Sequence, residues 1–375
     1  MKILAITNSR IPSLTANSIQ AMKMCDAMTQ LGHEVKLVAP AEARPVNWIE
    51  LSHRFGIRHK FQIEWRPSIR GLRRLDYAWH AQWAARSFKP DLIYTWLPQS
   101  AAFALGRRYP VVLEMHADVA GLLGPWWLRR FWKAGGRKRL LVTTQALRAA
   151  LERSTALTFP SDHVRIAPNG VDLDRYLNIP DAVQARRMLN LPECPTAGFT
   201  GHFYRGRGMD VLYELALALP DVSFLWVGGT PEAVDEWRTK LDSSGLVNVT
   251  LTGFVDNDRL PEYQAAADVL LMPYEASVSS SSGQDIAEVI NPMKMFEYMA
   301  AKRAIMSADL PSIREVLDDR SAVFCPAGDS AAWIAGLKNL LADKRHPAAL
   351  AEAARMAVEK YTWLARAEMA LAPLA

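Results

Sequence analysis

Short apolar runs, each about as long as a β-strand, alternate with helical patterns along most of this 375-residue chain. In the first half these runs predict strands at residues 2–7, 34–40, 61–65, 91–96, 111–116, 139–144 and 164–168. In the second half they predict strands at residues 196–201, 223–228, 249–253, 269–274, 303–308 and 322–326. Strands that alternate with helices form parallel sheets covered on both faces. The pattern therefore predicts an α/β protein with two doubly wound, Rossmann-like domains.

The alternation is interrupted between Ile179 and Pro195, where prolines punctuate the chain. A chain of 375 residues is also too long for one typical hydrophobic core. We therefore predict an N-terminal Rossmann-like domain over residues 1–180 and a C-terminal one over residues 181–360. Residues 361–375 predict a last helix that packs back on the N-terminal domain.

In doubly wound folds, ligands bind at the carboxyl ends of the strands and in clefts between domains. Neither first strand is followed by Gly-x-Gly-x-x-Gly, the fingerprint of dinucleotide binding. In the first domain the sequence Thr-Ala-Asn-Ser, residues 15–18, occupies that turn. A nicotinamide-dependent enzyme is therefore disfavoured.

Residues 291–300, Asn-Pro-Met-Lys-Met-Phe-Glu-Tyr-Met-Ala, run from a polar turn into a helix. Pro292 suits the first helical position, because it has no N–H to lose and its φ is already near the helical value. A helix start leaves N–H groups unpaired and carries partial positive charge, so a diphosphate can sit on it. Glu297 lies further along, where it can accept hydrogen bonds from a ribose diol. The alternative is an ordinary amphipathic helix with a solvated glutamate.

The first strand of the second domain ends in a glycine-rich turn, residues 198–208. Glycines let a backbone approach a ligand closely, and Arg205 and Arg207 bring permanent positive charge to this turn. In the first domain His116 ends a strand, and Asn169 begins a turn after another strand. A single histidine at a strand end is more often structural than catalytic, so both interpretations of His116 stay open.

The net charge of +5 is the sum of a basic first half and an acidic second half. Residues 1–180 hold 26 lysines and arginines against 13 aspartates and glutamates, and the rest holds 18 against 26. Aromatic and basic side chains are interleaved in residues 66–83 and 122–139, and in the second segment Leu123, Trp127 and Phe131 recur every four residues. This spacing leaves two interpretations open. The helix either lies on an anionic membrane surface or binds an anionic acceptor, or it forms a ridge that faces the core. Nucleic acid is not expected as a partner, because no recognition motif accompanies the charge.

Three cysteines, Cys25, Cys194 and Cys325, are far apart and have no histidine or cysteine at ligand spacing. They predict neither a disulfide framework nor a zinc site. A strand begins within the first residues, with no signal peptide, and no apolar run approaches about eighteen residues. We therefore expect a cytoplasmic protein with peripheral binding to the inner membrane face.

Several short motifs occur in a fixed order along the chain. They are Leu31-Gly32-His33-Glu34-Val35, Asn169-Gly170-Val171-Asp172, Gly201 with Arg207-Gly208, Val227-Gly228, Ala267-Asp268-Val269 leading to Pro273, the segment from Lys294 to Ala300, and then Ser307, Pro311 and Arg314-Glu315. Together they resemble the retaining glycosyltransferases of family 4 (group 1), which have the GT-B fold of two Rossmann-like domains facing a central cleft. The resemblance spans essentially the whole chain.

The resemblance implies transfer of a sugar from a nucleoside-diphosphate sugar, UDP- or GDP-linked, to a glycan, lipid-linked or small-molecule acceptor, with retention of configuration. It implies that Glu297 binds the donor ribose. The other residues on the donor side would be Asn291, Pro292, Met293, Lys294, Gly201, His202 and Gly228.

The resemblance also implies roles near the reacting atoms. Arg207 stands where relatives usually have the lysine of Lys-Gly, so Arg207 and Arg205 would stabilise the leaving diphosphate. His116 matches a histidine that lies near the transferred sugar. Ser13, Ala16, Asn17 and Asn169 would line the acceptor side of the cleft.

Three positions depart from the family pattern. The first of two expected glutamates is Val289, as in a subset of relatives; the arginine expected after Gly201 is His202; and a glycine-rich first loop is replaced by residues 15–18. The sequence therefore leaves a glycosyltransferase, a sugar-nucleotide epimerase on the same scaffold, and a non-catalytic partner subunit as alternatives. No paired acidic ligands mark a metal site, so we expect a metal-independent enzyme with no cofactor beyond its nucleotide-sugar co-substrate.

Overall fold

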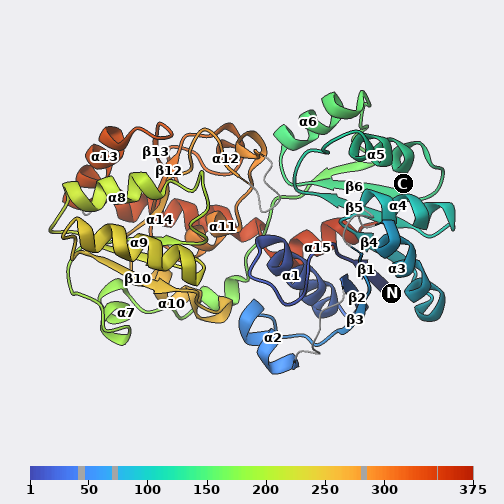
Figure 1. Ribbon diagram of the computed structural model, residues 1–375, viewed down its shortest axis with the longest axis horizontal. Coiled ribbons are helices and arrows are strands. Elements are labelled where there is room, and N and C mark those ends of the chain that lie inside the picture. The colour runs from blue at the N-terminus through green and yellow to red at the C-terminus, as the bar shows by residue number, and fades with distance from the viewer. Residues whose placement is uncertain (41–46, 70–74, 280–284, 344, 375) are drawn as a thin grey trace. The chain divides into compact units, whose positions relative to one another are not determined.

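The computed structural model describes residues 1–40, 47–69, 75–279, 285–343 and 345–374. The chain forms two compact units, one of Met1–Gly170 with Trp363–Ala375 and one of Val171–Thr362. Each unit is built on one parallel sheet flanked by helices (Figure 1).

The first unit has a seven-stranded sheet in the order β3-β2-β1-β4-β5-β6-β7. Its strands are β1 (Lys2–Ile6), β2 (Glu34–Pro40), β3 (Gln62–Arg66), β4 (Leu92–Thr95), β5 (Val111–Met115), β6 (Lys138–Val142) and β7 (Val164–Ile166). Its helices are α1 (Ala16–Gln30), α2 (Trp48–Phe55), α3 (Leu75–Phe88), α4 (Pro98–Gly106), α5 (Leu123–Lys133), α6 (Gln145–Thr155) and α15 (Trp363–Leu371). The strand order reverses between β1 and β4, which is where such sheets bind ligands.

The second unit has a six-stranded sheet in the order β10-β9-β8-β11-β12-β13. Its strands are β8 (Thr196–Thr200), β9 (Ser223–Val227), β10 (Val249–Gly253), β11 (Val269–Met272), β12 (Ala304–Ala308) and β13 (Val323–Cys325). Its α-helices are α7 (Ala182–Met188), α8 (Met209–Ala218), α9 (Pro231–Ser243), α10 (Leu260–Ala265), α11 (Met293–Ala300), α12 (Pro311–Arg314), α13 (Ser330–Ala342) and α14 (Arg345–Ala357). Short 3-10 helices are η1 (Leu173–Tyr176), η2 (Asn257–Arg259), η3 (Ala287–Val289) and η4 (Val358–Lys360). The strand order reverses between β8 and β11.

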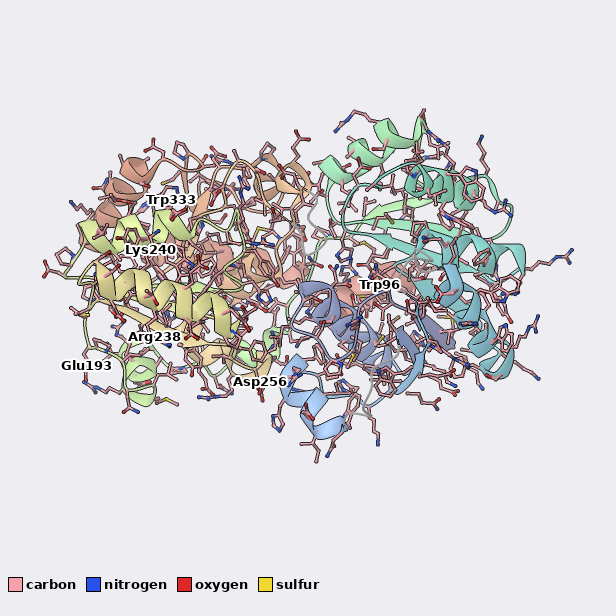
Figure 2. All side chains as sticks on the ribbon, in the orientation of Figure 1. Trp96, Glu193, Arg238, Lys240, Asp256 and Trp333 are labelled. Atoms are coloured by element: carbon pink, nitrogen blue, oxygen red, sulfur yellow. The ribbon has the colours of Figure 1, made fainter. Side chains whose placement is uncertain are left out.

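The central strands are buried along their whole length, which explains why they appear in the sequence as continuous apolar runs. Every residue of β5, β8, β9 and β12 is buried. This is expected of parallel strands with helices on both faces. Large side chains complete the second core, among them the fully buried Trp333 of α13 (Figure 2). Its indole N–H donates to the carbonyl of Pro326 at 3.1 Å.

The structure confirms both doubly wound sheets, and each of the thirteen predicted strands is present. Several end one or two residues before the predicted end. Gly201 and Gly228 show why, because their φ angles of 139° and 119° lie in the region that favours glycine and turn the chain out of the sheet.

The last helix, α15, belongs to the first unit, where it contacts α1 (Figure 1). Its carbonyl end is closed by Arg139 of β6, whose guanidinium donates to the carbonyls of Met369, Ala370, Ala372 and Pro373 at 2.7 to 3.2 Å. A cation there satisfies carbonyls that have no intrahelical partner. The first unit ends at Gly170, upstream of the boundary that the sequence predicts at residue 180.

Candidate functional site

The turn after β8 lies directly against the segment after β11, and two glycines make this approach possible. A Cβ atom on Gly208, whose φ is 75°, would lie 1.7 Å from the carbonyl oxygen of Pro273. One on Gly206, whose φ is 86°, would lie 2.3 Å from that of Ser277. No other residue fits at either position without moving the backbone. The turn that carries Arg205 and Arg207 is therefore held at the reversal point of the second sheet.

The turns after β8 and β9 also meet backbone to backbone. The N–H of Gly201 donates to the carbonyl of Val227 at 2.8 Å. A Cβ atom on Gly228 would lie 2.2 Å from the carbonyl oxygen of Gly201. Both predicted glycines thus line one backbone surface at the carboxyl edge of the sheet.

Arg207 is half-buried in this turn and keeps its positive charge uncompensated. Its guanidinium lies over the ring of Tyr274, 5.3 Å from the ring centroid. Burial raises the pKa of Tyr274, although the charge and hydrogen bond of Arg207 oppose that rise, so Tyr274 stays neutral. Within the described part of the chain, no carboxylate lies at ion-pair distance from Arg207 or from the exposed Arg205.

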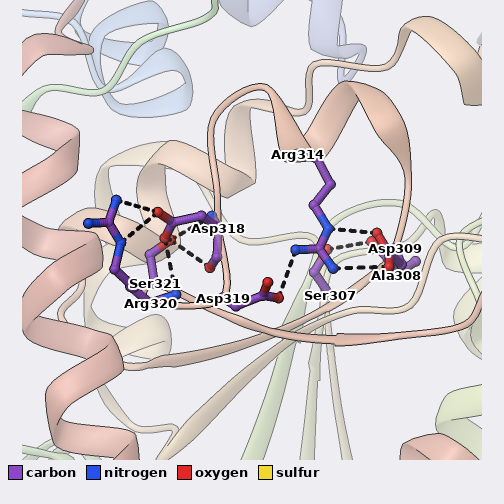
Figure 3. Close-up of polar contacts among 8 residues, drawn as sticks. All are labelled: Ser307, Ala308, Asp309, Arg314, Asp318, Asp319, Arg320 and Ser321. Carbon is purple, nitrogen blue, oxygen red and sulfur yellow. Dashed lines mark hydrogen bonds and ion pairs between the residues drawn. The ribbon is translucent and has the colours of Figure 1, made fainter.

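Arg314, another arginine at the carboxyl edge of this sheet, is fully paired by comparison (Figure 3). Its guanidinium donates to both oxygens of Asp309 at 2.7 and 3.0 Å and to Asp319 at 2.7 Å. It also stacks 3.6 Å from the ring centroid of Phe324. Two carboxylates neutralise Arg314, whereas Arg207 remains available to an anion.

Lys294 brings a second basic group to the same place from the first turn of α11. Its Nζ lies 3.7 Å from the ring centroid of Phe199 and has no hydrogen-bond partner among the described residues. A Cβ atom on Gly201 would lie 2.9 Å from this Nζ. Burial lowers the pKa of Lys294 well below its ordinary value, and the charge of Arg207 lowers it further, against a smaller opposing effect of Glu297.

His202 stands where the family resemblance predicts an arginine. It stacks on the ring of Tyr204, with centroids 4.7 Å apart and an interplanar angle of 11°. The Nζ atom of Lys294 lies beside Gly201, the residue that precedes His202.

The start of α11 differs from the sequence prediction by one residue. Met293 is the first helical residue, and Pro292 is the N-cap, with φ −76° and ψ 133°. Proline fixes φ but leaves ψ free, so it is equally compatible with the extended residue that leads the chain into the helix. Asn291, just before it, is buried.

Glu297 is held in place by residues that the sequence did not reveal. Its carboxylate accepts a hydrogen bond from Gln264 Nε2 at 3.1 Å, and Gln264 Oε1 in turn accepts from the hydroxyl of Tyr176 at 2.8 Å. The neighbouring Tyr298 hydroxyl accepts from the backbone N–H of Thr200 at 2.8 Å. The helix is thus fixed to the end of β8, and Glu297 is oriented by a buried pair.

In the first unit, the predicted residues follow the carboxyl ends of three strands. Ser13 comes between β1 and α1, and its carbonyl accepts from the hydroxyl of Ser18 at 2.9 Å. Ala16 and Asn17 are the exposed first residues of α1. Asn169 is buried after β7, and His116 directly follows β5.

His116 contacts a residue that the sequence did not single out, the buried Glu114. Burial by itself would raise the pKa of Glu114. The charges of Arg366 and His116 and their hydrogen bonds lower it below its usual range instead. The partners of Glu114 include Arg366, 252 positions away in the sequence, so no local pattern could have indicated this ion pair.

The two aromatic and basic segments are partly buried and partly exposed. Residues 70–74 of the first segment lie outside the described residues. On α5, Trp127 and Phe131 are buried, so the core-facing interpretation is right for these two, whereas Leu123 and Trp126 are exposed. Trp79 and Trp83 of α3 are exposed as well. Among the described helices, none has the length and apolar character required to cross a membrane.

The architecture is that of the GT-B glycosyltransferases. The crystal structure of HepE from Anabaena in complex with UDP is similar over 98% of both chains, with a TM-score of 0.76 and 17% identity. WaaG, a glycosyltransferase involved in lipopolysaccharide biosynthesis, is similar over 99% of this chain and 100% of its own, with a TM-score of 0.68 and 16% identity.

Family models cover both units. The model described as Glycosyltransferase Family 4 matches residues 18–175, and the one described as Glycosyl transferases group 1 matches residues 194–343. The chain therefore belongs to the family 4 (group 1) glycosyltransferases.

Curated relatives match parts of the chain. A putative teichuronic acid biosynthesis glycosyltransferase, TuaH of Bacillus subtilis, is 30% identical over 42% of this chain and 37% of its own length. The GDP-mannose-dependent alpha-(1-6)-phosphatidylinositol monomannoside mannosyltransferase of Mycolicibacterium smegmatis is 26% identical over 60% and 59%. The phosphatidyl-myo-inositol mannosyltransferase of Mycobacterium leprae is 31% identical over 68% and 64%. Each match spans less than two thirds of the relative's own length.

Proposed function

We propose that this protein transfers a sugar from a nucleoside-diphosphate sugar to an acceptor, with retention of anomeric configuration and without a required metal ion. The main support for this function is that Arg207 and Lys294 lie together at the carboxyl ends of β8 and β11. Neither has a carboxylate partner among the described residues, and both lie beside the turn that leads into α11. A guanidinium and an amine that a bound anion would charge, both beside a helix start, are suited to a diphosphate.

The proposed mechanism follows from where charge develops. Breaking the anomeric C–O bond places negative charge on the diphosphate and positive character on the sugar. Arg207, Lys294 and the N–H groups at the start of α11 stabilise the leaving group, and they are fixed before the reaction begins. The bound diphosphate raises the pKa of Lys294, because a nearby opposite charge favours the charged form. Glu297 accepts hydrogen bonds from the donor ribose, and the acceptor attacks the face that the diphosphate leaves, as the family resemblance implies.

A thermal-shift series with UDP, GDP, ADP and TDP tests donor binding, because a ligand that binds the folded state raises its stability by mass action. We expect one of the four to raise Tm and Glu297→Ala to weaken its binding about 10- to 100-fold, since hydrogen bonds to a charged group are lost. Glu236→Ala, at an exposed glutamate of α9, is the matched control and should bind like the wild type.

Incubation with the corresponding nucleotide sugar then tests transfer. Release of the nucleoside diphosphate with a retained glycosidic product supports the proposal. Formation of an epimer supports the epimerase instead, and failure of all four nucleotides to bind supports a non-catalytic subunit. Equal nucleotide affinity of Glu297→Ala and wild type removes the ribose role from Glu297.

We also propose that the first unit binds an anionic membrane surface and that the acceptor is lipid-linked. Trp79, Phe103, Trp127 and Trp126 form a continuous row of ring contacts across α3, α4 and α5, with centroids 5.9, 5.2 and 4.6 Å apart. The guanidinium of Arg130 lies over Trp126 at 5.6 Å. The exposed members of this row, Trp79 and Trp126, with Arg130 and the exposed Trp83, Leu122 and Leu123, define an aromatic–basic patch, whereas Trp127 is buried. Exposed tryptophan beside arginine suits the headgroup region of a bilayer. Two of the relatives described above carry phosphatidylinositol in their names.

Co-sedimentation with vesicles of phosphatidylglycerol and of phosphatidylcholine tests this surface. We expect preferential binding to phosphatidylglycerol, and we expect Trp126→Ser combined with Arg130→Glu to weaken that binding about ten-fold or more, since each basic residue near an anionic surface contributes about 1 kcal/mol. Val247→Ser, at an exposed apolar side chain of the second unit, is the control. Equal binding to both vesicle types would rule out the membrane proposal.

A further inference from the structure

The carboxylate of Glu114 lies at the carboxyl end of β5, with 0% of its side chain exposed. It accepts hydrogen bonds from Gln20 Nε2 at 2.5 Å, from the hydroxyl of Tyr94, and from both terminal nitrogens of Arg366 at 2.6 and 3.1 Å. His116 Nε2 contacts the same carboxylate. Donors from α1, β4, α15 and the turn after β5 therefore meet on one buried anion.

This ion pair is better explained by orientation than by stability. Removing two charges from water costs several kcal/mol for each ion, and apolar side chains of similar volume often stabilise a core equally well. A fully hydrogen-bonded pair instead fixes directions. Arg366 also donates to the carbonyls of Ala167 at 3.1 Å and Pro168 at 2.9 Å, directly before Asn169. One guanidinium of the last helix thus holds Glu114 and the turn that carries Asn169.

The tautomer of His116 follows from the charge on Glu114. The ionised carboxylate can only accept hydrogen bonds, so the Nε2 atom that faces it carries a hydrogen. In the neutral imidazole the lone pair is then on Nδ1. Nδ1 makes no hydrogen bond within the part of the chain that the structure describes, and 22% of the His116 side chain is exposed.

We propose that Glu114 and Arg366 are positioning residues for His116: Glu114 fixes the Nε2–H tautomer, and Arg366 holds Glu114 from α15. The lone pair of His116 Nδ1 is then left to accept a hydrogen bond from a ligand. The role of Nδ1 rests on the proposed function, whereas the tautomer and its dependence on Glu114 and Arg366 do not.

Nuclear magnetic resonance of protein labelled with ¹⁵N in the histidine rings reads the tautomer without any activity assay. His116→Asn identifies the His116 signals. We expect neutral His116 in the wild type to carry its hydrogen on Nε2. Glu114→Gln should give a mixture of tautomers, because an amide can donate as well as accept. Arg366→Met should give a smaller fraction of the Nδ1–H form, because Glu114 is then still ionised but no longer held against Nε2.

Arg139→Met is the matched control, because Arg139 also binds α15 but makes no contact with Glu114. It should leave the His116 tautomer unchanged. A hydrogen on Nδ1 in the wild type, or an unmixed Nε2–H form in Glu114→Gln, would overturn the proposal, and this second criterion remains measurable if Arg366→Met does not fold.

Transfer kinetics then test whether the tautomer matters for the reaction. Glu114→Gln should lower kcat about ten-fold or more with unchanged nucleoside-diphosphate affinity, as for residues that orient another group. Glu114→Gln combined with His116→Asn should be no slower than His116→Asn alone, because residues that act as a unit are not additive. Multiplicative losses would overturn the positioning role. Absence of nucleotide binding in the wild type would contradict the proposed function, while the tautomer measurement would still decide the positioning role.

Discussion

Replacing Arg207 by alanine is expected to lower turnover about 10²- to 10³-fold with the nucleotide sugar that the protein accepts. A loss of this size is typical when one fixed donor to a developing negative charge is removed. Arg207 is half-buried over Tyr274 and has no carboxylate partner in the described residues, so its charge is fully available to the diphosphate. Steady-state kinetics measure the change, and most of it should lie in kcat, because the charge on the leaving group grows toward the transition state.

Arg314→Ala is the matched control for this prediction. Arg314 lies at the same edge of the sheet, but Asp309 and Asp319 already accept its hydrogen bonds. Arg314→Ala should leave turnover within about a factor of two of the wild-type value. Loss of its exposed ion pairs should lower the free energy of unfolding by only about 1 kcal/mol or less. Unchanged kcat in Arg207→Ala, or equal losses in the two variants, would exclude Arg207 as the group that stabilises the leaving diphosphate.

The strands could be predicted because parallel strands with helices on both faces must be apolar along their length. The glycine-rich turn was also informative, since Gly206 and Gly208 lie where backbone meets backbone. Periodicity alone could not show which neighbours cover each face of α5. Trp127 and Phe131 therefore proved to be buried, while Trp126 in the same helix is exposed.

The contacts that orient Glu297 in the second unit and His116 in the first could not be predicted, because they join residues that are far apart in sequence. Gln264 and Glu297 are 33 positions apart, and Glu114 and Arg366 are 252 apart. A polar residue within an apolar strand, such as Glu114, does show that a partner is required, since a buried charge is costly without one. It does not show which residue supplies that partner.

Replacing Arg366 by methionine is expected to destabilise the first unit by about 3 to 5 kcal/mol at neutral pH, because removal of one partner leaves a buried charge unpaired. The wild-type pKa of Glu114 lies below its ordinary value. The ion pair therefore stabilises the fold fully above about pH 4.3, the ordinary glutamate pKa, and less as the pH falls through the lowered value. In Arg366→Met, the main positive charge that opposes the effect of burial on Glu114 is absent. The pKa of Glu114 therefore rises, and protonation of Glu114 removes part of the loss of stability.

The stability difference between wild type and Arg366→Met should therefore be largest at neutral pH and shrink as the pH is lowered toward 4. Hydrogen exchange in peptides from β5 and α15 measures it locally, which avoids treating a chain of two units as a two-state system. Arg139→Met is the control, because Arg139 binds only carbonyl groups at the end of α15 and no carboxylate. Its loss of stability should stay nearly constant over this pH range. If the two variants showed the same pH dependence, the pairing of Glu114 with Arg366 would not be the cause of the destabilisation, and α15 would contribute only its packing.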